Sequence, residues 1–353
     1  MYSPVLVALV STYISILLLN SFAVKLGLVD RPCTRKLHKG EVPLVGGMSV
    51  FFGVVTSLIL CSDLNQVVIL FVISAGIIVF IGVLDDKYDL SVRSRLIGQF
   101  LVGSILIFAL GDYITNLGDL FSLGQINIKQ FGVVFTLIAI LAAINAYNMI
   151  DGIDGLLGAL AIVSFTGIAV LGYENMHFSS YISIIFIASL LPFFLANLGV
   201  YPFKKLKIFM GDAGSMLIGL AIIWALVYSS QKTSLGEPIV RPVFALYVVA
   251  IPLMDMVAIM FRRISKGQSP FKPDRDHIHH IFMKAGFSSR QALAFITFSA
   301  LFILSIGIYG EVTQMKELYL LIIIASLFLL YAFVIKRAWT VIKFFKLIQK
   351  GVI

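Results

Sequence analysis

The stretch FGVVFTLIAILAAINAYNMIDGIDGLLGALAIVSFTGIAVLG, residues 131–172, joins two long apolar segments through a short polar one. Segments 131–147 and 156–172 are each long enough to cross about 30 Å of hydrocarbon as a helix. Between them, two amides and two carboxylates recur at a spacing of three residues: Asn145, Asn148, Asp151 and Asp154. Carboxylates at the end of a membrane span are costly to desolvate, so they are usually retained because they pair, bind a cation or act on a substrate. The stretch predicts a membrane protein with a polar site where two helices end.

The rest of the chain has the same apolar character. Of its 353 residues, 59% are hydrophobic and 13% are charged, and the mean hydropathy of +1.01 is far above that of soluble globular proteins. Runs of membrane-spanning length lie at 5–24, 44–61, 67–84, 96–110, 131–147, 156–172, 181–198, 212–228, 243–261, 292–308 and 318–335. We therefore predict an all-α polytopic membrane helical bundle of about eleven transmembrane helices, with residues 1–353 forming a single domain.

The basic residues indicate an orientation, because Lys and Arg resist translocation and mark the cytoplasmic side. If the loop after the first span is cytoplasmic, 23 of the 27 Lys and Arg residues lie on that side. This predicts a periplasmic N-terminus and a cytoplasmic C-terminus. The net charge of +9 then reflects topology and attraction to anionic lipid, so the expected partner is the lipid bilayer and not nucleic acid.

Most acidic residues and four of the five histidines fall on the same predicted side. Eleven of the 18 acidic residues are there: Asp30, Glu41, Asp85, Asp86, Asp89, Asp151, Asp154, Asp212, Asp255, Asp274 and Asp276. A membrane enzyme with a water-soluble substrate would present its polar groups to one aqueous surface in this way. A channel or carrier would place ionisable groups near the bilayer midplane. The distribution favours an enzyme over a transporter, and a non-catalytic membrane scaffold stays a third alternative.

Asp85 and Asp86 follow directly on the third predicted span, in IGVLDDKYDLSVRSR. Two adjacent carboxylates repel each other, and a cation or a shared proton would relieve the repulsion. A solvated helix end is the alternative interpretation, but acids at a helix C-terminus oppose the macrodipole. We therefore predict a functional acid pair.

Oxygen donors recur in the motifs that follow. The four Asn and Asp side chains of 145–154 trace a shallow spiral on one side of a helix, and such donors suit Mg²⁺, which usually binds one or two carboxylates with substrate phosphates and waters. In FMGDAGS, residues 209–215, Asp212 begins another span. As a helix N-cap alone it would need no further explanation. The nearby lysines at 204, 205 and 207 are placed to meet a polyphosphate.

PDRDHIHH, residues 273–280, combines two acids, an arginine and three histidines. A transition-metal site is one interpretation, because His is a common metal ligand. However, neither a Cys nor a spaced second His pair completes a tetrahedral set, so contact with phosphate or pyrophosphate fits better. The first cytoplasmic loop, with Lys36 and His38, could bind an anionic headgroup or could be a positive-inside signal only.

Together the motifs resemble the polyprenyl-phosphate N-acetylhexosamine-1-phosphate transferase family. The motifs that carry the resemblance are LDDKYDLS, NAYNMIDGIDGLLG, FMGDAGS, IPLMDMVAIMFRR and SPFKPDRDHIHHIFMKAGFSSRQA, and they cover nearly the whole chain. The related phospho-MurNAc-pentapeptide branch carries consecutive histidines where this chain has HIHH. The chain is therefore more similar to the N-acetylglucosamine branch.

The resemblance implies a phosphotransferase of the bacterial inner membrane with its active site on the cytoplasmic face. The implied reaction transfers GlcNAc 1-phosphate from UDP-GlcNAc to undecaprenyl phosphate, giving undecaprenyl-diphospho-GlcNAc and UMP, with Mg²⁺ or Mn²⁺ as cofactor. It would initiate O-antigen or related lipopolysaccharide synthesis. Another UDP-N-acetyl sugar is the alternative donor, and whether the chain forms a homodimer stays open.

The resemblance also implies roles for individual residues. Asp85 or Asp86 would position or deprotonate the lipid phosphate, and Asp212 with Asn148 would hold the metal. Asp151 and Asp154 would shape the nucleotide and metal site as further catalytic residues. The remaining polar residues of the motifs would bind substrate: Asn145, Lys36, His38, Arg275, His277, His279 and His280.

Overall fold

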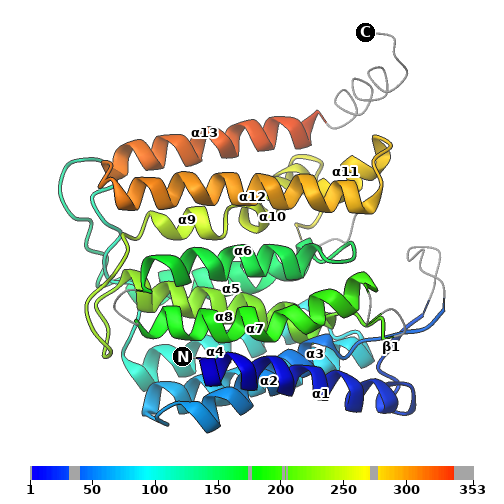
Figure 1. The fold of residues 1–353 in the computed structure, drawn as a ribbon. Helices are drawn as coiled ribbons and strands as arrows, with labels where there is room; N and C mark the ends of the chain where they lie inside the picture. The colour runs from blue at the N-terminus through cyan, green and yellow to red at the C-terminus, as the bar shows by residue number, and fades with distance from the viewer. Residues whose placement is uncertain are drawn as a thin grey trace.

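The computed structural model describes residues 2–31, 40–173, 177–200, 203, 206–270 and 277–337. In chain order these form α1 (Tyr2–Leu26), β1 (Val29–Asp30), β2 (Val42–Pro43), α2 (Gly46–Cys61), α3 (Gln66–Tyr88), α4 (Val92–Leu110), α5 (Gly132–Ile150), α6 (Leu156–Leu171), α7 (Phe178–Leu198), α8 (Gly211–Ser230), α9 (Phe244–Val248), α10 (Ala250–Ser265), α11 (Ile278–Lys284), α12 (Ser289–Val312) and α13 (Glu317–Lys336). The long helices lie side by side in one bundle (Figure 1). Among the described residues, the only sheet is the two-residue pairing of β1 with β2.

The predicted membrane helical bundle is confirmed. Within the described part of the chain, eight helices are long and apolar enough to cross a bilayer: α1, α3, α4, α5, α7, α8, α12 and α13. Two further apolar helices, α2 and α6, are shorter. The chain is therefore a multi-pass membrane protein.

The run 243–261, predicted as one continuous span, is broken at Val249 into α9 and α10. Pro252 explains the break, because it has no N–H to donate to the carbonyl of Val248 one turn earlier. The hydroxyl of Ser164, on α6, donates to that carbonyl instead at 2.8 Å. A side chain from a neighbouring helix thus satisfies the carbonyl group that Pro252 leaves without a helical partner.

Helix α8 is the centre of the bundle. Its apolar window is 94% buried, against 17% for the peripheral helices α1 and α13, and every residue from 213 to 230 is buried. A helix that is hydrophobic all round needs such a position. It packs against α3 and α5, and also against α2, α6 and α7.

Small residues bring two helix backbones against the start of α8. A Cβ atom added to Gly47, on α2, would lie 2.2 Å from the backbone nitrogen of Gly214. One added to Gly82, on α3, would lie 2.3 Å from the Cα atom of Ala213. Close backbone approach through small residues is a usual way for membrane helices to pack. Here it brings the end of α3 against the start of α8.

We expect Gly82→Ala to destabilise the protein by about 1–3 kcal/mol, as overpacking does, because the added methyl would overlap backbone atoms that cannot rotate away. The matched control is Gly76→Ala on the same helix, where the added Cβ would meet only Phe51 at an ordinary 3.6 Å. Apparent melting temperatures in detergent measure the difference. Equal melting temperatures for the two variants would contradict the close contact.

A second, smaller apolar core holds α11 against α10 and α13. Its buried members are Ala258, Ile259, Ile281, Ala285 and Ile335, with Ile278, Phe287, Tyr331 and Ala332 packed around them. The sequence predicts a short interfacial helix at 278–287, and the structure confirms a helix there, α11. His279 and His280 of HIHH therefore lie on a helix that packs against the last long helix described, and His277 directly precedes that helix.

Candidate active site

The described residues of the polar motifs lie at one end of the bundle. There α3, α5, α7 and α10 end, and α4, α6, α8 and α12 begin. Helix α11 and strand β1 lie at the same end (Figure 1). The segment before α8 is tied to this end by backbone hydrogen bonds, in which Gly46 and Gly47 donate to Phe209 and Met210, each at 2.9 Å.

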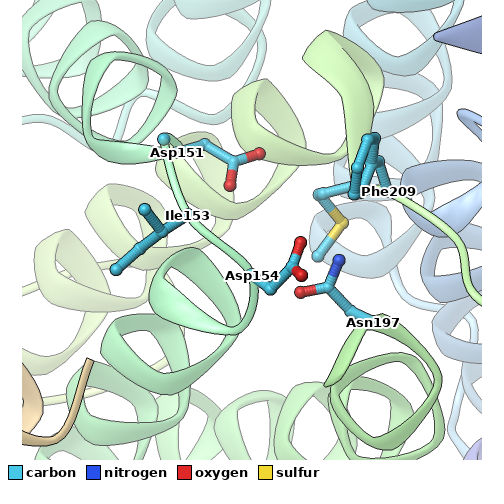
Figure 2. Close-up of a pocket in the computed structure, with 7 residues that line it drawn as sticks. Asp151, Ile153, Asp154, Asn197 and Phe209 are labelled. Atoms are coloured by element: carbon cyan, nitrogen blue, oxygen red, sulfur yellow. The ribbon is translucent and has the colours of Figure 1, made fainter. Parts of the chain in front are cut away.

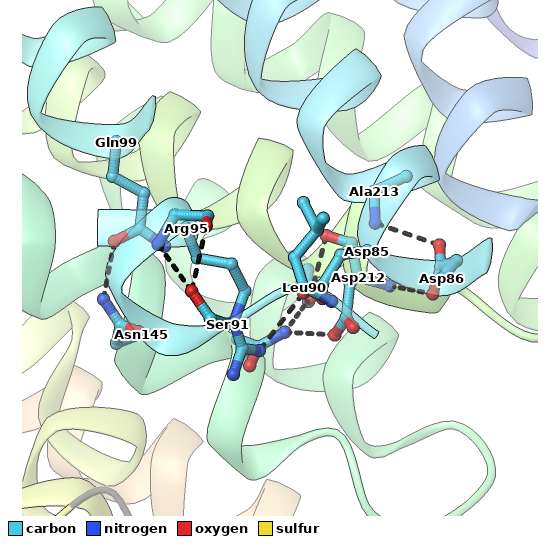
Figure 3. A network of polar contacts seen from close by, with 12 residues as sticks. Asp85, Asp86, Leu90, Ser91, Arg95, Gln99, Asn145, Asp212 and Ala213 are labelled. Atoms are coloured by element: carbon cyan, nitrogen blue, oxygen red, sulfur yellow. Dashed lines mark hydrogen bonds and ion pairs between the residues drawn. The ribbon is translucent and has the colours of Figure 1, made fainter. Parts of the chain in front are cut away.

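Asp86 caps the start of α8 from the neighbouring helix α3. Its Oδ1 accepts the backbone N–H of Asp212 at 2.8 Å, and its Oδ2 accepts that of Ala213 at 3.3 Å (Figure 3). These N–H groups have no partner within their own helix. Gly211 makes room for the carboxylate, since a Cβ there would lie 2.5 Å from Asp86 Oδ2.

Asp85 points to a different set of partners. Its Oδ1 accepts the backbone N–H of Leu90 at 2.8 Å, and Arg95 Nη1 lies 3.2 Å from its Oδ2 (Figure 3). The side chain is buried and also lies beside the carboxyl group of Asp212. Asp85 is thus partnered by Arg95 and Asp86 by the positive end of α8, while both carboxyl groups still lie beside that of Asp212. Relief of the acid pair by a cation or a shared proton stays a prediction.

Asp212 is the point at which the acids converge. Asp85, Asp86 and Asp151 all lie close enough to it for mutual repulsion. Asn148 donates its amide to Asp212 Oδ1 at 2.5 Å and to the Ser215 hydroxyl at 2.9 Å. The interpretation of Asp212 as an N-cap is wrong, because Asp86 supplies the capping oxygens and the carboxylate of Asp212 faces the other acids.

Asp151 and Asp154 line a pocket of about 120 Å³ with Asn197, Phe209 and neighbouring residues (Figure 2). Asp154 Oδ2 forms an ion pair with Lys207 Nζ at 2.7 Å. Residue Asp151 as a whole is exposed, but protein atoms are packed around its carboxyl group. Desolvation, together with the nearby charges of Asp212 and Asp154, raises the pKa of Asp151 to about 7. A bound cation would favour its ionised form.

Asn197, at the end of α7, is a site residue that sequence reasoning missed. Its Oδ1 accepts the backbone N–H of Gly155 at 2.5 Å, and its Nδ2 donates to the carbonyl of Ile208 at 2.8 Å. It therefore fixes the turn that carries Asp151 and Asp154 against the segment that leads into α8. The available signal was a single amide one residue before the end of an apolar span, which is weak without knowing its neighbours.

His279 brings the histidine motif to the turn between α5 and α6, residues 151–155, called here the acidic turn. It is buried, and its ring lies directly over Gly152, where an added Cβ would be 2.1 Å from Nε2. Neither ring nitrogen has a hydrogen-bond partner among the described residues. Burial and the neighbouring His280 and His277 lower the pKa of His279 well below its usual value. Burial therefore favours the neutral imidazole, which packs on Gly152.

The other predicted site residues are placed as follows. His280 lies beside His279, with ring centroids 4.2 Å apart, and His277 contacts Asp255. Asn145 donates to Gln99 Oε1 at 2.7 Å and so joins α5 to α4, and its role in substrate binding stays a prediction. Lys36, His38 and Arg275 lie outside the described residues.

A second cavity of about 290 Å³ lies between α5, α8, α9 and α10. Its lining is almost entirely apolar and includes Ala139, Ala142 and Ala146 of α5, and it extends to Gln231 at the far end of α8. It is suited to hydrocarbon and not to a sugar nucleotide.

The acid cluster fits a hard divalent cation that is shared with substrate. Within the described residues, no group of three or more His, Cys, Asp or Glu is arranged as a complete metal site. Mg²⁺ does not need one, because it is usually bound by one or two carboxylates with substrate phosphates and waters. Asp212 is the candidate carboxylate. Asn148 uses its amide hydrogens on Asp212 and Ser215, so its carbonyl oxygen is the atom left for a cation.

Comparisons with known proteins identify the family of the chain. The model of Glycosyl transferase family 4 matches residues 68–230. Three bacterial proteins named undecaprenyl-phosphate alpha-N-acetylglucosaminyl 1-phosphate transferase align along most of their length. The Yersinia pestis protein is 45% identical over 92% of this chain and 88% of the relative. The Escherichia coli (strain K12) protein is 43% identical, covering 93% and 89%, and the Pasteurella multocida (strain Pm70) protein is 41% identical, covering 99% and 98%. The resemblance inferred from the motifs is confirmed: the chain belongs to the undecaprenyl-phosphate α-N-acetylglucosaminyl 1-phosphate transferases of Glycosyl transferase family 4.

Proposed function

We propose that this protein transfers GlcNAc 1-phosphate from UDP-GlcNAc to undecaprenyl phosphate, releasing UMP. The observation that carries the proposal is the convergence of Asp85, Asp86 and Asp151 on Asp212 at one end of a membrane bundle. A water-soluble diphosphate and a lipid phosphate could meet there. The product would initiate O-antigen synthesis or that of a related surface polysaccharide.

We also propose that this end of the bundle faces the cytoplasm of a bacterial inner membrane. The distribution of Lys and Arg supports this orientation, with eleven spans, a periplasmic N-terminus and a cytoplasmic C-terminus. For this count, α2, α6 and the broken pair α9 and α10 each cross the bilayer with the eight long helices. UDP-sugars would then reach the site from the compartment in which they are made.

The chemistry needs charge control more than a strong base. A phosphate monoester has a second pKa of about 6 and is largely dianionic at neutral pH, so positioning and charge neutralisation dominate phosphoryl transfer. We favour direct attack of the lipid phosphate on the β-phosphorus of UDP-GlcNAc. The alternative is a two-step route through an aspartyl phosphate.

The described residues divide these tasks among themselves. The pocket beside Phe209 and Asn197 would take the nucleotide, and Lys207, paired with Asp154 at 2.7 Å, would meet its phosphates. Arg95, beside Asp85, would attract the lipid phosphate. Mg²⁺ or Mn²⁺ held by Asp212 and Asn148 would neutralise charge on the diphosphate. The apolar cavity along α5 would hold part of the polyprenyl chain.

An assay with membranes that express the chain tests the proposal. Undecaprenyl phosphate and Mg²⁺ are supplied with UDP-GlcNAc, UDP-GalNAc or UDP-glucose in parallel, and the extracted lipid is identified by mass spectrometry. We expect undecaprenyl-diphospho-GlcNAc from UDP-GlcNAc, with equal amounts of UMP, because both products come from one transfer. Membranes without the chain are the control.

A second assay, with purified enzyme and no lipid acceptor, separates the two routes. Direct attack predicts that purified enzyme releases no UMP from UDP-GlcNAc alone. Stoichiometric UMP release with labelling of the protein would establish the covalent route instead. Absence of any lipid-linked sugar with every donor would refute the proposed function.

A further inference from the structure

Asp255 is a buried carboxylate on α10 with three hydrogen-bond donors around it. Its Oδ2 lies 2.6 Å from Nδ1 of His277. Its Oδ1 accepts the backbone N–H of Ile278 at 3.1 Å and the hydroxyl of Tyr331 at 2.7 Å. The side chain is 1% exposed, so the group is held in place by these contacts and not by solvent.

This arrangement favours one position for a proton on His277. The Asp255 carboxylate accepts hydrogen bonds from Ile278 and Tyr331, and a carboxylate that acts as an acceptor favours the tautomer in which the facing Nδ1 atom carries the hydrogen. The second ring nitrogen is distinguished from the first by that bond. Nε2 is therefore the ring atom that His277 can offer to a ligand, and its direction is set by the position of Asp255.

The same carboxylate fixes the start of α11. His277 precedes α11, and the N–H of Ile278 is one of the groups that the helix itself leaves unpaired. Two residues further on, His279 packs on Gly152, and the rings of His277 and His279 are stacked with centroids 5.8 Å apart. A substitution at Asp255 would therefore displace His277 and, through the stacked rings, His279, which packs on the acidic turn.

Tyr331 adds α13 to this arrangement. Only 17% of the apolar window of α13 is buried, as expected for a helix that faces lipid. Yet Tyr331 turns its hydroxyl to Asp255, and Ile335, one turn further on, is buried in the small core beneath α11. The last long helix described thus supports the histidine motif as well as crossing the bilayer.

We propose that Asp255, supported by Tyr331, is a positioning residue that holds His277 as its Nδ1–H tautomer and presents Nε2 to the phosphates or sugar of the substrate. The inference rests on the proposed function for what His277 contacts. The hydrogen bond and the tautomer are properties of the protein without substrate, so they are tested separately from activity.

The test combines the kinetics of two variants with an NMR measurement of the His277 tautomer. In Asp255→Asn, the new amide can donate to the ring and shift the proton to Nε2. We expect kcat/KM to fall about 10- to 100-fold, as for other partners that orient a functional histidine. Tyr331→Phe keeps the carboxylate and should lower kcat/KM less. Asp63→Asn, in the exposed loop between α2 and α3, and Tyr319→Phe, exposed on α13, are the matched controls.

The tautomer is read by ¹⁵N NMR of histidine-labelled protein at alkaline pH, with His277→Gln assigning the signal. We expect the Nδ1–H form in the wild type and a shift toward Nε2–H in Asp255→Asn. An Nε2–H tautomer in the wild type would overturn the proposal. So would an active Asp255→Asn with unchanged kcat/KM. If Asp255→Asn does not fold, a Tyr331→Phe variant with an unaltered His277 signal and unaltered kcat/KM overturns it. Wild type without transferase activity but with the expected tautomer would refute the proposed function alone.

Discussion

Replacing Asp212 with asparagine is expected to remove most activity while making the protein more stable. The carboxylate lies among Asp85, Asp86 and Asp151, and neighbouring like charges disfavour one another. Asparagine keeps an oxygen to accept the 2.5 Å bond from Asn148, so the local structure persists without the repulsion. The charge that would hold the cation is lost, and we expect kcat/KM to fall by about 10³-fold, comparable to the loss of one electrostatic group in other active sites.

The measurements are kcat/KM with Mg²⁺ in excess and the apparent melting temperature in detergent without Mg²⁺. Asp63→Asn, at the opposite end of the bundle, removes an exposed carboxylate and should change neither quantity. If Asp212→Asn keeps the wild-type kcat/KM, the carboxylate of Asp212 takes no part in the reaction. One that melts at a lower temperature would show that the acids are not in net repulsion in the free protein.

Asp86→Ala is expected to lower activity as well, but with the opposite change in stability. The variant leaves the N–H groups of Asp212 and Ala213 without the oxygens that they now meet at 2.8 Å and 3.3 Å. Loss of a helix cap costs about 1–2 kcal/mol, and a buried donor left unpaired adds to that cost. Because Asp212 lies in this first turn, the start of α8 should shift and kcat should fall.

The control for Asp86→Ala is loss of a cap outside the acid cluster. Asn65 caps α3 at the opposite end of the bundle by accepting the N–H of Val68 at 2.9 Å, so Asn65→Ala should lower the melting temperature while leaving kcat near that of the wild type. If Asp86→Ala is inactive yet melts like the wild type, its role is chemical. In that case the capping explanation is wrong.

The fold was predictable from sequence because bilayer physics acts on single segments. Each apolar run must form its own helix, since backbone polar groups in hydrocarbon have to be satisfied internally. The break at Val249 shows the limit of this argument. Pro252 is visible in the sequence, but the hydroxyl of Ser164 that compensates for it comes from a different helix.

The site was predictable in its composition and less so in its contacts. The acidic residues and the histidine motif were identified by type and by side of the membrane. Their partners depend on which helices are in contact. The structure was therefore needed to show that Asp86 caps α8 and that Asn197 links two segments. Asp255 was recognised as an acid of the same side, but nothing in its local sequence indicates His277 as its partner.

The backbone contacts of Gly47 and Gly82 with the start of α8 bear on inhibition of the enzyme. Where backbone meets backbone, almost any side chain larger than hydrogen is excluded, as the 2.2 Å and 2.3 Å clashes show. An inhibitor that binds the main chain at this junction would face a surface that substitution can hardly reshape. Resistance would then have to arise at more distant positions, or through higher expression of the enzyme.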